Sequence, residues 1–268
     1  TLSDLDLYLN LVGQPFFFPH LYLINEAFKL ASLDNVQKVF NGADGDTVVS
    51  HGFEYLVELF LKFRWLKLFK EIKKIAKVSN KSKRFIFKRA VVGQIFYDKK
   101  IYFSAKKQHR AVLSAPIHSS AIEIQSLVAS YYNVKEVHPF YNMDLVNYCI
   151  NVRPDLKING FSRYILREAI KGIVPEKNRN RTDKSNLGHG LVYSFLNKDK
   201  KFIEDQISNP NEIIKDLIDI NTIESLWKKL LKNPRKYSTL SNIPSLIFAY
   251  VVANRWLEIV EFNNKEKT

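Results

Sequence analysis

Residues 36–52 read VQKVFNGADGDTVVSHG and join a short apolar run to a loop rich in glycine and aspartate. The apolar run, Val36, Val39 and Phe40, has the length and residue types of a short buried strand. Glycines let a loop backbone approach a phosphate closely, and aspartate oxygens are ligands for hard cations. The stretch therefore predicts a strand, a loop that binds a phosphate or a metal ion, and then a helix. Taken alone, the loop is also compatible with an ordinary Asp/Gly turn.

The size and composition of the chain predict a folded protein with a substantial core. It has 268 residues, of which 46% are hydrophobic, enough for one large domain or two small ones. Its only cysteine, Cys149, excludes an intrachain disulfide and a cysteine-based zinc site, so we expect a cytoplasmic location. The longest apolar run, 243–260, contains Pro244, Asn254, Arg255 and Glu258, which predicts a buried helix and no membrane span.

The formal net charge of +14 is concentrated between residues 62 and 89, where Glu71 is the only acidic residue. Apolar residues recur at helical spacing from Leu59 to Ile75, which predicts one amphipathic helix over 54–75 with a basic outer face. That face is either a solvated surface or, from Leu61 to Lys77, a docking surface for an anionic partner. No RNA-binding motif accompanies the charge, so we do not expect nucleic acid to be the partner.

Most of the remaining chain also shows helical patterns, and the last residues, 263–268, form a polar tail. The predicted helices cover 25–33, 119–132, 143–152, 162–171, 202–220, 223–231 and 245–260.

Four ordered motifs follow in the second half of the chain. They are His138-Pro139-Phe140-Tyr141-Asn142, Pro154-Asp155-Leu156-Lys157, Arg163-Tyr164-Ile165-Leu166-Arg167-Glu168-Ala169 and Arg181-Thr182-Asp183-Lys184. Together with the Gly/Asp loop, they resemble the C-terminal half of the asparagine synthetase domain, a family that includes enzymes closing lasso peptides and β-lactam rings. The resemblance covers roughly residues 10–195.

This resemblance implies a fold and an activity. The fold would be the C-terminal part, residues 1–262, of an α/β adenine-nucleotide α-hydrolase-like synthetase domain, predominantly helical here with one short buried strand. The activity would be an ATP-dependent amide ligase, in which a carboxylate attacks the α-phosphate of ATP, pyrophosphate leaves, and an amine opens the acyl-adenylate.

The resemblance also assigns roles to individual residues. Asp46 stands where the family binds Mg²⁺, and Lys184 where it places the lysine that contacts pyrophosphate and the adenylation transition state. Asn41 and Gly42 would line the nucleotide, and Arg181 would flank the same site. Asp46 capping the following helix is the alternative from the residues alone. For Arg163 and Arg167, a structural ion pair with Glu168 or Asp144 is an alternative to substrate contact.

The chain departs from the family pattern at several positions. Ala43 stands where asparagine synthetases carry a glutamate, and alanine can neither accept nor donate a proton, which argues against free aspartate as the substrate. Glu123 is a candidate replacement carboxylate. Lys135, Val137 and Asn142 replace the acidic residue, the arginine and the aspartate of the family's Pro-Phe-x-Asp element.

The family's pyrophosphate-binding Ser-Gly-Gly-x-Asp-Ser loop does not occur in these 268 residues, and neither does its cysteine glutaminase domain. We therefore expect a fragment, a split subunit or a remnant of a synthetase, working with an N-terminal synthetase or glutaminase portion on a small-molecule or peptide carboxylate. A non-catalytic remnant that binds a partner is the alternative. The ligase hypothesis requires Asp46 and Lys184 to converge on one nucleotide-sized hollow.

Overall fold

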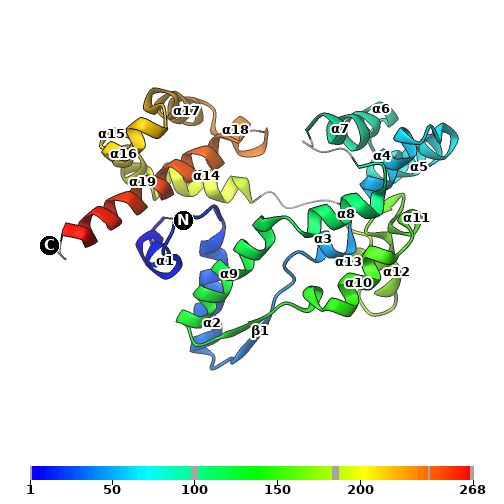
Figure 1. The fold of residues 1–268 in the computed structure, drawn as a ribbon, viewed down its shortest axis with the longest axis horizontal. Helices are drawn as coiled ribbons and strands as arrows, with labels where there is room; N and C mark the ends of the chain where they lie inside the picture. The colour runs from blue at the N-terminus through cyan, green and yellow to red at the C-terminus, as the bar shows by residue number, and fades with distance from the viewer. Residues whose placement is uncertain (1, 98–101, 183–186, 241, 266–268) are drawn as a thin grey trace. The chain divides into compact units, whose positions relative to one another are not determined.

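The computed structural model describes residues 2–97, 102–182, 187–240 and 242–265 (Figure 1). The fold is mostly helical (72%) with few strands, as the sequence predicts. The chain divides into two compact units, each built from separate segments. The first unit comprises Thr1–Val39, Ala121–Glu136 and Ser185–Thr268, and the second comprises Phe40–Ser120 and Val137–Lys184.

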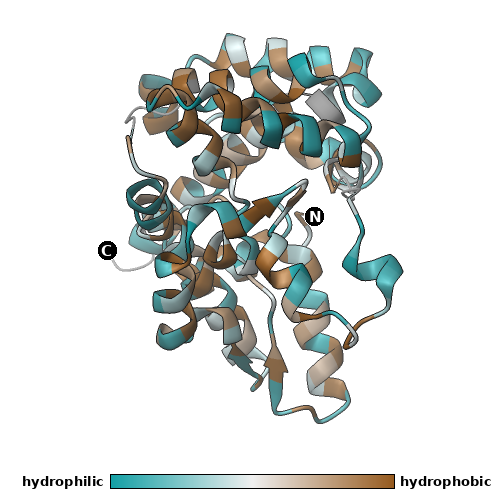
Figure 2. Cartoon of the chain, turned by 90° about the vertical axis from the view of Figure 1, so that its right-hand side faces the viewer, coloured by the Kyte–Doolittle hydropathy of each residue, from teal (hydrophilic) through white to brown (hydrophobic). Residues whose placement is uncertain are grey.

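The first unit is a helical assembly. Its elements are α1 (Leu5–Val12), α2 (Leu21–Leu33), most of α9 (Pro116–Tyr131), α14 (Gly188–Asn197), α15 (Lys200–Ser208), α16 (Glu212–Leu217), α17 (Ile220–Lys232), α18 (Pro234–Leu240) and α19 (Ile243–Lys265). Its described helices carry both hydrophobic and hydrophilic residues, as do those of the second unit, which allows each helix to bury one face (Figure 2).

The C-terminal helix α19 provides the centre of the first unit's core. By length and composition, Ile243–Asn264 is one candidate to cross a membrane. However, Ile247, Val251 and Val252 are completely buried in the hydrophobic core, and α19 packs against α1, α15 and α17. These contacts are those of a core helix.

The second unit contains the remaining elements. They are α3 (Gly45–Val49), α4 (Phe53–Leu61), α5 (Trp65–Ser79), α6 (Lys83–Phe87), the π-helix η1 (Lys88–Val92), α7 (Gly93–Tyr97), α8 (Ala105–Leu113), the 3₁₀-helix η2 (Pro139–Tyr141), α10 (Met143–Asn151), α11 (Pro154–Lys157), β3 (Ile158–Asn159), β4 (Phe161–Ser162), α12 (Tyr164–Ala169) and α13 (Glu176–Arg179). Strands β3 and β4 pair antiparallel. A larger core lies among α4, α5 and α6, and a smaller one joins Val48 and Val49 of α3 to Cys149 of α10.

Strand β1 (Lys38–Phe40) is present, but the prediction that it is buried is wrong. Its exposure alternates between exposed and half-buried, and Phe40 is 72% exposed. In the described part of the chain β1 pairs only with β2 (Lys135–Val137), so no further strand lies beside it. The bonds Lys135 N–H to Gln37 C=O and Asn41 N–H to Val137 C=O advance in the same direction along both strands, which is the pattern of a parallel pair.

The helix predicted over 54–75 is interrupted and forms α4 and α5 instead. Phe63 adopts a left-handed conformation (φ 54°), and the Arg64 N–H donates to the Leu59 carbonyl at 2.8 Å, which closes the end of α4. The periodicity of the sequence concealed this break because Leu56 and Leu59 before it and Leu68 after it pack into the same core.

Candidate functional site

The Gly/Asp loop, residues 41–52, lies in the second unit and begins where β1 ends. The Asn41 N–H donates to the Val137 carbonyl at 2.8 Å, which continues the pairing between the strands. The Asn41 side-chain oxygen accepts the N–H of Ala43 at 2.8 Å, which makes a local turn. Asp44 then takes a left-handed conformation (φ 54°) and leads into α3.

Two glycines of this loop are required by packing. A Cβ atom on Gly45 would lie 2.7 Å from the Phe140 ring. A Cβ on Gly52, which has φ +82°, would lie 2.7 Å from the Cβ of Ile158. Gly42 differs, because it is exposed and a Cβ there would meet no atom within 4 Å. Gly42 is therefore the loop glycine that a ligand can approach.

The two aspartates of the loop have different environments, and Asp44 is a structural residue. The Tyr141 hydroxyl donates to Asp44 Oδ2 at 2.6 Å, and His118 Nδ1 lies 3.0 Å from Asp44 Oδ1. Burial and the bond to Asp44 raise the pKa of Tyr141 well above its usual value, so the hydroxyl stays protonated as the donor. Asp44 thus ties the loop to η2 and to the start of α9.

Asp46 is the accessible acid, with 45% of its side chain exposed. His51 Nε2 lies 3.3 Å from Asp46 Oδ2. The bond to His51, helped by the charges of His51 and Arg163, lowers the pKa of Asp46 to about 2. Asp46 therefore carries a full negative charge at neutral pH. The alternative that Asp46 caps α3 is wrong, because the cap position belongs to Asp44 and no side chain makes the capping bond.

A chain of buried polar groups, formed by Lys157 and His109, is hydrogen-bonded to the main chain of α3. His109 Nε2 lies 2.9 Å from the Thr47 carbonyl, and Lys157 Nζ lies 3.0 Å from His109 Nδ1. Since a carbonyl only accepts, His109 must donate a hydrogen bond through Nε2 and accept one from Lys157 Nζ at Nδ1. The two side chains are 1% and 4% exposed, and burial lowers the pKa of both. Sequence reasoning missed this pair, because 48 positions separate them and neither lies in a chemical motif with the other.

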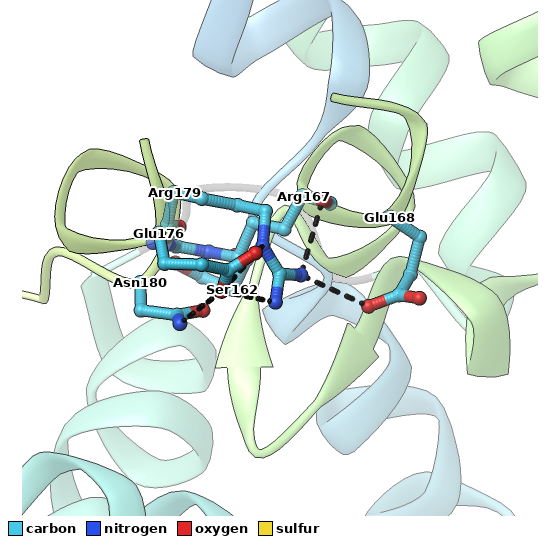
Figure 3. A network of polar contacts seen from close by, with 6 residues as sticks. All are labelled: Ser162, Arg167, Glu168, Glu176, Arg179 and Asn180. Carbon is cyan, nitrogen blue, oxygen red and sulfur yellow. Dashed lines mark hydrogen bonds and ion pairs between the residues drawn. The ribbon is translucent and has the colours of Figure 1, made fainter. Parts of the chain in front are cut away.

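Arg167 and Arg179 lie side by side in a network of polar contacts (Figure 3), next to the segment that contains Arg181. Arg181 is exposed, and its carbonyl accepts a bond from Arg167 at 3.0 Å. The alternative that Arg167 forms an ion pair with Glu168 or Asp144 is wrong, since Arg167 binds carbonyl groups and Glu168 instead lies 3.4 Å from Arg179.

The structure brings together only some of the predicted site residues. Asn41, Gly42 and Asp46 share one loop. Glu123 is exposed on the part of α9 that belongs to the first unit. Lys184 lies outside the described residues, so its convergence with Asp46 remains a prediction.

The acidic and histidine residues described by the structure form no group of three that could hold a metal ion alone. The loop fits Mg²⁺ in another way, with the exposed Asp46 carboxylate as one ligand and substrate phosphates and water as the others, a common arrangement for this ion. Two large hollows, of about 800 and 760 Å³, are lined by residues outside the loop. The gap beneath the loop, beside His109 and Lys157, has no room for a water molecule.

Comparison with known proteins identifies one family. A family model described as asparagine synthase matches residues 15–258. No curated protein and no solved structure gives a significant match.

Proposed function

The chain belongs to the asparagine synthase family, and we propose that it contributes the ATP site of an amide-forming ligase. In the proposed reaction a carboxylate is adenylated by ATP and then attacked by an amine, with release of pyrophosphate and AMP. One observation carries this proposal: Asp46, on the loop that follows β1, is ionised and open to solvent while its neighbour Asp44 is fully engaged in structural bonds.

Each proposed site residue has a physical role. Asp46 would hold Mg²⁺, which when bound neutralises charge on the polyphosphate. Asn41 and the open Gly42 would border the nucleotide, and Arg181 would lie beside it. Lys184 would stabilise the charge that develops on the leaving pyrophosphate, a role that suits a compact ammonium group. The α/β adenine-nucleotide α-hydrolase fold is part of this proposal, and the parallel pairing of β1 and β2 supports it.

The substrate would be a small-molecule or peptide carboxylate. Half-buried Ala43 offers no proton acceptor, so we propose a substrate other than free aspartate, with Glu123 as the candidate acid or base. A peptide side chain that reacts with its own N-terminus, as in lasso-peptide cyclases, fits this requirement. We also propose that the site works with an N-terminal synthetase portion that carries the pyrophosphate loop, or with a glutaminase portion, and that the assembly works in the cytoplasm.

Exchange of labelled pyrophosphate into ATP tests this function, using the protein together with the N-terminal synthetase portion and a peptide that carries an acidic side chain as the carboxylate substrate. We expect Lys184→Ala and Asp46→Asn each to lower the exchange rate at least about 100-fold, the usual effect of removing a group that stabilises transition-state charge. Lys177→Ala is the control, because Lys177 is exposed in the same unit and has no proposed role. Exchange that persists in both site variants would show that these residues do not form the ATP site.

A second function, partner binding without catalysis, is favoured by one surface of the second unit. Phe63, Leu66 and Phe69 are 77%, 89% and 57% exposed, beside the exposed Lys70 and other lysines of α5. Exposed apolar side chains among cations fit an acidic partner that also carries apolar residues. Absence of exchange in the assembled protein, together with loss of assembly in Leu66→Ser/Phe69→Ser, would favour this function over the ligase.

A further inference from the structure

The guanidinium of Arg167 binds three main-chain carbonyl groups from two segments of the second unit. Figure 3 shows Arg167 with two of the three partner residues, Ser162 and Arg179. Its Nε donates to the carbonyl of Ser162 at 3.0 Å, and Nη2 donates to the carbonyl of Arg181, also at 3.0 Å. Its Nη1 donates to the carbonyl of Arg179. One side chain on α12 therefore connects the end of β4 with the residues that follow α13.

Arg179 in turn binds the segment that carries Arg167. Its Nη1 donates to the carbonyl of Arg167 at 3.3 Å, while its Nη2 lies 2.8 Å from Glu176 Oε2 and its Nη1 lies 3.4 Å from Glu168 Oε1. Figure 3 shows these side chains lying across one another between α12 and α13. The two arginines thus join the same pair of segments in opposite directions, which restricts their relative movement.

Arg167 depends on these carbonyls for its stabilisation. Among the residues that the structure describes, it forms no ion pair with a carboxylate, and the ring of Phe161 lies 5.1 Å from its guanidinium carbon. Burial and the charges of Arg163 and Arg179 lower the pKa of Arg167. If residues 179–181 moved away, a half-buried cation would lose two of its three carbonyl partners, so the cation opposes that movement.

We propose that Arg167 is a positioning residue that fixes residues 179–181 against α12 and so holds Arg181 in place. Arg181 is exposed, and its carbonyl accepts the bond from Arg167. The catalytic consequence rests on the proposed function, in which Arg181 lies beside the nucleotide. The restraint on residues 179–181 does not rest on that function.

Limited digestion with trypsin tests the restraint, because Arg179 and Arg181 are themselves trypsin sites. In Arg167→Gln we expect cleavage at these sites to be at least about tenfold faster than in the unaltered protein, since several charge-assisted bonds are lost. Arg167→Lys should also be cleaved faster, because one ammonium cannot reach all three carbonyls, and it serves if Arg167→Gln does not fold.

Arg153→Gln is the matched control for digestion, since it removes the same charge from an arginine whose side chain is 75% exposed. A thermal unfolding curve for each variant shows whether the overall fold persists. Unchanged cleavage at the two sites in Arg167→Lys, relative to Arg153→Gln, would overturn the proposed restraint.

Pyrophosphate exchange by the assembled protein tests the catalytic consequence. We expect Arg167→Lys to lower kcat about 100-fold with little change in KM for ATP, because a displaced site residue weakens the transition state more than substrate binding. Faster cleavage with unchanged kcat would overturn the link between the restraint on Arg181 and catalysis. No exchange in the unaltered protein would contradict the proposed function, and the digestion result would still decide the restraint.

Discussion

At the residue scale, the structure distinguishes two aspartates of the Gly/Asp loop, Asp44 and Asp46, that look equivalent in the sequence. Asp44 receives bonds from Tyr141 and His118, whereas Asp46 keeps an exposed carboxylate beside His51. The sequence predicted the loop and selected Asp46, but it could not assign Asp44. Its partners lie 97 and 74 positions further along the chain, and only folding places them beside it.

The buried pair of His109 and Lys157 leads to a prediction at this scale. Phenylalanine at position 109 can neither accept from Lys157 nor donate to Thr47, so a buried ammonium loses its partner. We expect His109→Phe to lower the free energy of unfolding by about 3 kcal/mol. Adding Lys157→Met removes the stranded charge, so the double variant should be more stable than His109→Phe alone.

Urea denaturation of the four proteins in this double-mutant cycle measures the coupling between the two side chains. Lys157→Met alone is the internal control for the packing of the methionine. If the two substitutions simply add, the hydrogen bond between Lys157 and His109 does not contribute to stability.

At the element scale, the structure explains why Asn142 can stand where the family resemblance predicts an aspartate. Asn142 replaces the family's aspartate, and its side-chain oxygen accepts the N–H groups of Asp144 and Leu145 at the start of α10. Asparagine and aspartate cap helices about equally well. The replacement therefore preserves the start of α10, and the departure does not by itself indicate loss of the fold.

This cap predicts different outcomes for two substitutions. Asn142→Ala removes the acceptor and should cost about 1 kcal/mol of stability, whereas Asn142→Asp should remain within about 0.5 kcal/mol of the unaltered protein. Thermal unfolding at neutral pH measures both. Equal losses for alanine and aspartate would mean that the amide group of Asn142, and not its oxygen, matters.

The helices and strands show which features the sequence patterns predicted and which they missed. The spacing of apolar residues correctly predicted helices at 25–33, 119–132 and 143–152, because each helix buries one regular face. It missed the end of α4, where Phe63 takes a left-handed conformation that glycine usually adopts. It also predicted burial for β1 from residue type alone, whereas burial depends on the layers that cover a strand.

At the scale of the whole molecule, each unit has its own hydrophobic core. Gly52→Ala introduces strain at φ +82° and a contact with Ile158 in the core of the second unit, which together should cost about 2–4 kcal/mol. We expect this loss in the second unit alone, because domains with separate cores unfold as separate units.

The three tryptophans allow this to be measured. Trp65 lies in the second unit, and Trp227 and Trp256 lie in the first. Trp→Phe substitutions give two reporter proteins, one that keeps only Trp65 and one that keeps only Trp227 and Trp256. We expect Gly52→Ala to lower the urea midpoint of the protein that keeps Trp65 and to leave the midpoint of the other unchanged. Gly172→Ala is the control, since it has φ +76° but no atom within 4 Å of the added Cβ. A shift of both signals would show that the chain unfolds as one cooperative body.

The order of segments along the chain has a consequence for biosynthesis. The second unit is complete by residue 184, whereas the first unit needs the segment from residue 185 to the last helix, α19. A ribosome releases the N-terminal part first, so the second unit can fold while α1 still awaits its packing partner α19 on the growing polypeptide. During that interval the apolar face of α1 is exposed, and it is a surface on which a chaperone would act in the newborn protein.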